Sequence, residues 1–396
     1  MNYPLPNKIA RKECLMLKEK LNSKFLNHMI GVLVCENKEG KQEIIKAFSG
    51  QIDGSYNQEG WAPPCFDEAK FKALASVYDL LIKENEQFES KVISKEAQEK
   101  IFDLYEFTCI DQTTFKIKDV FFKKLPPTGT GDCCEPKLLN QAFRFGLTPL
   151  SMDEFYFGEN INFKKNGEFY PPCDEKCKPL LKKMFKLDII YVDNFIIVVN
   201  KPHGLLAVPG RTPENQDCIT NRVKTLFPNC IDQPAVHRLD QDTSGLMVLS
   251  FDKECHKNLS KQFIAKTVFK QYIALIEGKI LTKSGTIELK FRLDPENRPH
   301  QIYDEKMGKL GITKFERVKI LKHEGKTVTK ILFTPLTGRT HQLRLHSSHE
   351  KGLASPIVGD RLYGHKGEKL MLQAKLLEFN HPITGKRLSF ELEDEF

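Results

Sequence analysis

The segment His237–Gly245 places an arginine and two carboxylates among small and hydroxylated residues, directly after the apolar residues 234–236. If Asp240 in this segment is buried, its charge is costly unless a positive group pairs with it. A matching cation is available far along the chain, in the segment Thr337–Arg344. Two polar segments of opposite charge that are distant in sequence are typical of an active site assembled by folding.

The length and composition indicate a globular protein of two or more domains. The chain has 396 residues, of which 40% are hydrophobic and 28% are charged. Its formal net charge is +8, and most of the positive excess lies in residues 187–396, together with the polar segments. A partner that carries phosphates fits this distribution, and a lysine-rich solvated surface fits it equally well.

The eleven cysteines do not indicate a secreted disulfide framework. The first residues are polar and lack the apolar segment of a signal peptide, and no apolar run is long enough to span a membrane. We therefore expect a reduced, cytoplasmic protein whose thiols are free or bound to metal.

The first part of the chain, residues 1–185, is predicted to be an α+β domain. Its pattern indicates a helix-like stretch over 8–27, strands at 29–35 and 44–48, a helical stretch at 66–105 and a helix at 136–145. The pattern changes near Phe185, after which β-branched strands are expected at 189–192 and 195–199. We place the domain boundary there.

Four cysteines in the loops of this first domain are candidate metal ligands: Cys133, Cys134, Cys173 and Cys177. Four thiolates brought together would suit tetrahedral zinc. Adjacent cysteines are awkward as joint ligands, however, and the spacing of Cys173 and Cys177 is looser than Cys-x-x-Cys. Zinc binding and free buried cysteines both remain open.

Five segments in the second part of the chain, in this order, resemble the RluA-type pseudouridine synthases. They are Lys201–Gly204, His237–Gly245, Lys270–Tyr272, Gly338–Arg344 and Gly359–Gly364. The resemblance covers roughly residues 187–396. It departs from the family pattern at Ser355, where the family often has a histidine. Residues Leu206–Arg211 further resemble a short subgroup that modifies both large-subunit rRNA and tRNA anticodon stem-loops.

The resemblance implies an enzyme that converts uridine in folded RNA to pseudouridine without a cofactor or metal. Asp240 would be the nucleophile, attacking either ribose C1′ or uracil C6. Arg344 would form an ion pair with Asp240 and keep it charged. Tyr272 would stack on the uracil and be available to remove the C5 proton.

The resemblance also implies residues that hold the substrate. Because the target uridine must leave its stack, Arg238 would fill the vacated space and Leu343 would form an apolar wall of the pocket. Thr243 is placed on the substrate side, and Lys201 is expected to be a phosphate or a structural contact. His237 and His341 are interpreted as buried hydrogen-bonding residues in preference to acid–base catalysts.

The fold class we expect is α+β. Residues 186–396 would form a catalytic domain with a long, bent, mixed β-sheet and a cleft across its middle, preceded by the α+β domain 1–185. The first domain resembles an extension found on some longer family members. Four of its cations could extend an RNA-binding surface: Lys137, Arg144, Lys164 and Lys165.

The expected partner is structured RNA, such as an rRNA or tRNA stem-loop, and we expect a monomer that uses no nucleotide cofactor. Two alternatives remain. One is a non-enzymatic RNA-binding or ribosome-assembly factor that keeps the fold. The other is a hydrolase that uses Asp240 as a general acid–base, although the segment offers no second carboxylate with a suitable spacing.

Overall fold

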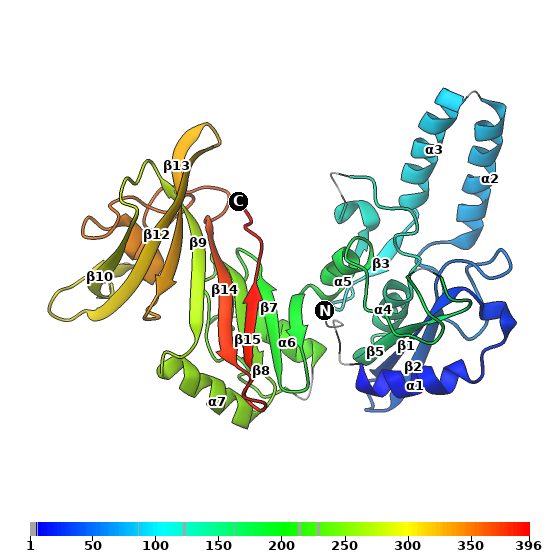
Figure 1. Ribbon diagram of the computed structural model, residues 1–396, viewed down its shortest axis with the longest axis horizontal. Helices are drawn as coiled ribbons and strands as arrows, with labels where there is room; N and C mark the ends of the chain where they lie inside the picture. Colours follow the sequence, from blue (N-terminus) through cyan, green and yellow to red (C-terminus); the bar gives the residue numbers. More distant parts are fainter. Residues whose placement is uncertain are drawn as a thin grey trace. The chain divides into compact units, whose positions relative to one another are not determined.

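The computed structural model describes residues 5, 7–85, 87–121, 124–161, 163–212, 215–227 and 230–396. The chain forms two compact units, and the change from the first to the second falls at Asn194 and Phe195 (Figure 1). The predicted boundary near Phe185 coincides instead with the end of helix α5. None of the described helices combines the length and the apolar character that crossing a bilayer requires.

The first unit is built on a three-stranded antiparallel sheet with the order β2-β1-β5. The strands span Gln42–Phe48 (β2), His28–Glu36 (β1) and Thr148–Phe157 (β5). Every residue from 29 to 35 is buried, so both faces of β1 are covered. Helix α1 (Lys8–Lys18) and helix α4 (Cys134–Arg144) both pack on this sheet.

The two helices pack on opposite faces of the sheet. Cys14 of α1 shares a core cluster with Ile30 and Val32, which point to the same face of β1. The intervening Gly31 points to the other face, where a Cβ would lie 2.7 Å from Cβ of Cys134 in α4. The small residue at position 31 therefore allows α4 to approach the sheet closely.

The predicted helical stretch at 66–105 is two helices, α2 (Glu68–Glu84) and α3 (Gln87–Phe102). Asp67 begins α2 by accepting hydrogen bonds from two backbone N–H groups of its first turn. Asn85 ends it, since its side-chain amide donates to the carbonyl of Leu81. The apolar residues of α2 are partly buried or exposed, and none of its residues is fully buried.

The remaining elements of the first unit are short. They are two 3₁₀ turns (Ser23–Phe25 and Ile117–Asp119), strands β3 (Glu106–Thr108), β4 (Thr114–Lys116) and β6 (Asp188–Val192), and helix α5 (Cys177–Phe185). The predicted strands β1, β2 and β6 and the predicted helix α4 are confirmed. The first predicted helix ends earlier than expected, at Lys18.

The second unit is dominated by one large sheet with the strand order β11-β10-β12-β13-β9-β14-β8-β7, with β15 paired to β14 (Figure 1). Its strands are β7 (Ile196–Lys201), β8 (Ser244–Ser250), β9 (Phe269–Glu277), β10 (Ser284–Leu293), β11 (Gln301–Tyr303), β12 (Lys309–His323), β13 (Lys326–Pro335), β14 (Leu372–Asn380) and β15 (Arg387–Glu391). β8 and β14 run parallel, whereas the other described pairs in this unit are antiparallel. Helices α6 (Ile219–Leu226), α7 (Lys253–Ile264) and α8 (Gln342–Ser348) complete the elements. The expected α+β class with a large mixed sheet is confirmed.

One row of paired residues crosses this sheet and positions the polar segments. Lys201 at the end of β7 is paired with Gly245 at the start of β8, and Gly245 is paired with Ala374 of β14. Ala374 is in turn paired with Tyr272 of β9. Because neighbouring strands lie about 4.8 Å apart, this row brings three of the motif segments to the same level of the sheet.

Gly245 is required at this crossing, and replacing it tests the register. Its φ is +114°, and a Cβ there would lie 2.3 Å from the carbonyl oxygen of Ala374. Gly278 also has a positive φ (71°), but a Cβ there would meet nothing within 4 Å.

We predict that Gly245→Ala lowers the free energy of unfolding by about 2–5 kcal/mol, and Gly278→Ala by only about 1 kcal/mol. Denaturant unfolding measures both, and equal losses would contradict this arrangement.

Candidate active site

The loop after β7 and the loop before β8 are joined through Lys201. Its buried ammonium donates hydrogen bonds to the backbone carbonyls of Pro202 (2.9 Å), Leu205 (2.6 Å) and Gln241 (2.9 Å). Gly204 adds a backbone bond to the Gln241 carbonyl (2.9 Å), and the Gln241 side chain returns one to the carbonyl of Gly204 (3.0 Å). The turn that carries Gly204 therefore fixes the loop that carries Asp240.

This geometry corrects the expectation that Lys201 contacts substrate. The residue has no exposed surface, and its three donated bonds occupy the ammonium group. Burial lowers the pKa of Lys201. The charges of Asp240 and Asp242 raise it but do not fully compensate, and the resulting pKa is about 8. Lys201 thus has the structural role that the sequence left open, and not that of a phosphate contact.

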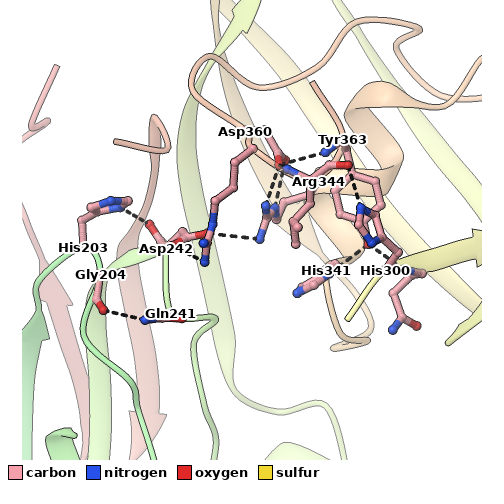
Figure 2. A network of polar contacts seen from close by, with 12 residues as sticks. His203, Gly204, Gln241, Asp242, His300, His341, Arg344, Asp360 and Tyr363 are labelled. Carbon is pink, nitrogen blue, oxygen red and sulfur yellow. Dashed lines mark hydrogen bonds and ion pairs between the residues drawn. The ribbon is translucent and has the colours of Figure 1, made fainter. Parts of the chain in front are cut away.

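A network of two arginines and two aspartates lies beside this loop. Three of its members, Arg344, Asp242 and Asp360, are buried and are labelled in Figure 2, and the fourth, Arg361, is exposed. Arg344 of α8 donates to the Asp360 carboxylate from Nε (2.9 Å) and Nη2 (2.5 Å), and their side chains are 2% and 0% exposed. Nη1 of Arg344 lies 3.8 Å from the carboxylate of Asp242. Asp242 in turn accepts two bonds from Arg361, at 2.9 and 3.3 Å. The network joins α8, the turn after Gly359 and the Asp240 loop.

The expected ion pair between Arg344 and Asp240 is wrong. Across the part of the chain that the structure describes, Arg344 forms its ion pairs with Asp360 and Asp242, and Asp240 forms none. Burial opposes the charge of Arg344, but the hydrogen bonds and charge of Asp360, followed by the charges of Asp240 and Asp242, raise its pKa. Asp360 is fully buried and needs a direct partner more than the half-buried Asp240 does.

Asp240 lies at the centre of the site, although it has no ion-pair partner among the residues that the structure describes. Its negative charge perturbs the pKa values of five groups that come from four segments of the second unit: Lys201, Tyr272, His341, Arg344 and Tyr363. Because such effects fall off with distance, these segments converge around its carboxylate. The chain thus brings together the three predicted catalytic residues.

Tyr272 reaches the site from β9. The tyrosine packs against a core cluster that includes Phe333 and Leu343. Burial and then the charge of Asp240 raise its pKa, so the phenol is protonated in the free protein. An apolar ring with a protonated hydroxyl beside a carboxylate can stack on a flat base and take part in proton transfer.

Comparison with known proteins identifies this arrangement. A family model described as RNA pseudouridylate synthase matches residues 195–349. The dual-specificity RNA pseudouridine synthase RluA of Haemophilus influenzae is 42% identical over 215 residues, which are 53% of this chain and 94% of that protein. The chain belongs to the RluA-type pseudouridine synthases.

Further relatives agree with this assignment. The proteins of the same name from Haemophilus ducreyi and from Escherichia coli strain K12 are 39% and 35% identical, covering 58% and 53% of this chain and 98% and 94% of theirs. Among solved structures, human RNA Pseudouridylate Synthase Domain Containing 1 is 28% identical, with a TM-score of 0.45 over 53% of this chain and 84% of that one.

The histidines of this synthase have structural surroundings. Nε2 of His237 accepts a hydrogen bond from the backbone N–H of Val248 (3.1 Å), and its ring stacks on Phe263. Burial, followed by the charge of Lys270, lowers the pKa of His237 to about 3. Burial likewise lowers the pKa of His341, whose Nδ1 lies 2.9 Å from the hydroxyl of Tyr363 (Figure 2). Both surroundings favour the hydrogen-bonding interpretation over acid–base catalysis.

The other predicted substrate residues differ in exposure. Arg238 is exposed and thus available to RNA, whereas Leu343 is 7% exposed and belongs to the core cluster beside Tyr272. Thr243 is also buried, and its backbone N–H donates to the carbonyl of Asp240 (3.1 Å). The contact of Thr243 therefore shapes the loop that carries Asp240.

Sequence reasoning missed the residues that hold Arg344 in place. It recognised the Gly359–Gly364 segment as a motif but assigned no role to Asp360. It also missed Gln342, whose buried amide accepts from Thr337 (2.7 Å) and donates to the Ile312 carbonyl (3.0 Å). One property of the sequence could have pointed to Asp360 and Gln342. Both are polar side chains next to apolar residues, and a polar side chain that becomes buried needs a hydrogen-bond partner.

The first unit gathers three of the four candidate metal-binding cysteines. The sulfur atoms of Cys133, Cys173 and Cys177 all lie within 4.8 Å of one another. Cys134 is directed elsewhere, since its thiol donates to the carbonyls of Met29 (3.1 Å) and Ala47 (3.5 Å). The predicted set of four cysteines is therefore wrong in one member.

Lys137 is likewise misplaced as part of an RNA-binding surface. It is 1% exposed, and its ammonium donates to the carbonyl of Phe48 at 2.8 Å. Arg144, Lys164 and Lys165 remain candidates for such a surface.

The Arg344–Asp360 pair provides a test of the network. We predict that Asp360→Asn destabilises the protein by about 3–5 kcal/mol, because it leaves a buried guanidinium without its hydrogen-bonded counter-charge and with only the more distant Asp242. The control Arg361→Ala should change stability by about 1 kcal/mol or less, since the side chain of Arg361 is 51% exposed. Thermal and denaturant unfolding measure both, and a small loss for Asp360→Asn would show that Asp242 alone is enough to balance Arg344.

Proposed function

We propose that this protein isomerises uridine to pseudouridine in RNA with Asp240 as its nucleophile. The observation that supports this best is the difference between its carboxylates. Asp242 and Asp360 are each neutralised by arginine, whereas Asp240 forms no ion pair among the described residues and is only half-buried. Asp240 is therefore the acid of this cluster whose oxygens are free to attack a substrate.

The proposed reaction exchanges one glycosidic bond for another. The bond from ribose C1′ to N1 breaks, the bond from C1′ to C5 forms, the C5 proton leaves and N1 gains a proton. Attack of Asp240 on C1′ and attack on C6 are both compatible with the site. In either case the carboxylate becomes a neutral ester for the lifetime of the intermediate, and its negative charge passes to the substrate.

The proton of Tyr272 has a place in this exchange. Burial and the charge of Asp240 raise the pKa of Tyr272, so the phenol is protonated in the free enzyme. Because N1 must gain a proton and C5 must lose one, the phenol can donate its proton to N1, and the resulting phenolate can then remove the C5 proton. We therefore assign two roles to Tyr272, stacking on the detached uracil and removal of the C5 proton.

We further propose that the substrate is structured RNA, an rRNA or tRNA stem-loop, that enters the site as an extruded nucleotide. Arg238 is exposed beside the nucleophile and would occupy the space that the base leaves in its stack. Leu343 would line the pocket where its core cluster borders Tyr272. We propose that the protein acts in the cytoplasm as a monomer.

The isomerisation is proposed to need no cofactor, because the bonds broken and formed belong to one nucleotide and the residues supply the acid, base and nucleophile. The zinc ion that the cysteines suggest would belong to the first unit. The alternative of a non-enzymatic RNA-binding factor predicts that RNA binding alone matters and that Asp240 can be replaced without effect.

The role of Asp240 is tested with Asp240→Asn, which keeps the shape of the side chain but removes the nucleophile. We predict a loss of uridine isomerisation of at least about 10⁴-fold with RNA affinity largely unchanged. The assay is release of tritium from RNA that carries [5-³H]uridine. Asp232→Asn is the matched control, because Asp232 is fully exposed and should retain activity. An active Asp240→Asn protein would favour the non-enzymatic alternative or another nucleophile.

The second role of Tyr272 is tested with Tyr272→Phe, which keeps an aromatic ring but removes the hydroxyl. We predict that turnover falls by about 10²–10⁴-fold, the usual contribution of a general base, while RNA affinity stays within a few-fold. Single-turnover tritium release and filter binding measure the two quantities. Wild-type turnover in this variant would restrict Tyr272 to stacking.

A further inference from the structure

We propose that Cys133, Cys173 and Cys177 bind a zinc ion in the first unit, at a site that has no part in uridine isomerisation. Their three sulfur atoms lie within 4.8 Å of one another, although Cys133 is far from the other two in sequence. Contraction to a metal requires only small side-chain movements, since each Zn–S bond is about 2.3 Å long. Thiolates at this separation are a ligand set that zinc prefers.

Two of the three cysteines lie at helix N-termini. Cys133 is the residue that precedes α4, and Cys177 is the first residue of α5. The two helices pack against each other, so the positive ends of both dipoles lie next to the three sulfurs. Helix N-termini lower the cost of a cysteine thiolate, which is the form that binds metal.

The turn between Cys173 and Cys177 also has the hydrogen bonds of a metal-binding loop. The backbone N–H of Cys177 donates to Sγ of Cys173 (3.4 Å), a bond that stabilises negative charge on the sulfur. The N–H of Lys178 donates to the carbonyl of Cys173 (3.1 Å) and closes the turn. Cys173 is exposed and Cys177 is buried, so an ion can enter from solvent at Cys173.

A buried carboxylate provides an independent observation. Glu135, in the first turn of α4, is 0% exposed, and its carboxylate lies next to that of Glu154, which is also buried. Its charge acts on both Cys133 and Cys177, which places it beside the cluster. Two buried acids side by side are costly, and a divalent cation nearby would offset their negative charge. Glu135 thus borders the site on its buried side, next to the three sulfur ligands.

The ion would fasten a loop to the sheet of the first unit. Cys133 leads into α4, which packs on β1, β2 and β5, whereas Cys173 belongs to the irregular segment between β5 and α5. A nearby contact has the same effect, since Lys176 donates to the carbonyl of Thr128 (2.7 Å). Zinc bound here is therefore structural, and its free energy of binding adds to the stability of this unit.

Metal content of the full-length protein tests the site. After purification in reducing, chelator-free buffer, elemental analysis should find one zinc per chain. Cys133→Ser, Cys173→Ser and Cys177→Ser should each lose it. Cobalt(II) added to the metal-depleted protein should give the visible absorption of tetrahedral thiolate coordination. The melting temperature should fall on depletion and recover with zinc.

Matched variants separate the site from a general effect of losing a cysteine. Cys134→Ser should keep its zinc, because a hydroxyl can donate to the same carbonyls of Met29 and Ala47. Glu135→Gln should weaken zinc binding by about 10–100-fold and yet stabilise the metal-free protein, since it removes one of two adjacent buried acids.

Three results would overturn the proposal. They are the absence of zinc and of a cobalt spectrum in the folded wild-type protein, a disulfide between two of the three cysteines under the same reducing conditions, and an equal loss of zinc in Cys134→Ser. Unchanged zinc affinity in Glu135→Gln would remove the carboxylate from the site. None of these readouts depends on the isomerase activity.

Discussion

The buried ion pair between Arg344 and Asp360 is the interaction on which the active site depends. Neither side chain has appreciable contact with water, so each charge is tolerable only because the other is bonded to it at short range. Through Asp242 and Arg361 the pair extends to the loop that carries Asp240. As a result, the arginines neutralise two aspartates, whereas Asp240 has no ion-pair partner in the described part of the chain.

A site of this kind places a positive charge near the proposed nucleophile without blocking it. A direct guanidinium bond would occupy the lone pairs of Asp240 that must attack the substrate. Arg344 instead acts on Asp240 through space while its own donors are bound to Asp360. The paired row of residues through Lys201, Gly245 and Tyr272 then sets the distance between the Asp240 loop and the ring of Tyr272.

Much of this could be predicted from the sequence. β-branched runs identified β6 and β7, and motif spacing identified Asp240, Tyr272 and Arg344 as one site. The partner of Arg344 could not be predicted, because sequence does not tell which of several aspartates a buried guanidinium meets. The structural role of Lys201 could not be predicted either. Its hydrogen-bond acceptors are backbone carbonyls, which every residue has, so no sequence motif indicates them.

The candidate metal-binding cysteines were also predicted only in part. Cys133 and Cys134 are neighbours in sequence, but successive residues at a helix start point in different directions, so only Cys133 joins the cluster. The contribution of Glu135 is visible only once its burial is known. The first unit lies outside the residues that the family model matches, and its proposed zinc site distinguishes its structural chemistry from that of the catalytic unit.

The central claim is that Asp240 converts uridine to pseudouridine in cellular RNA. Mapping pseudouridines at single-nucleotide resolution in rRNA and tRNA, with and without the gene, tests it most directly. We predict that at least one site is lost in the deletion strain, is restored by the wild-type gene, and is not restored by a gene that encodes Asp240→Asn. A deletion strain that keeps every pseudouridine, or full restoration by that variant, would contradict the account.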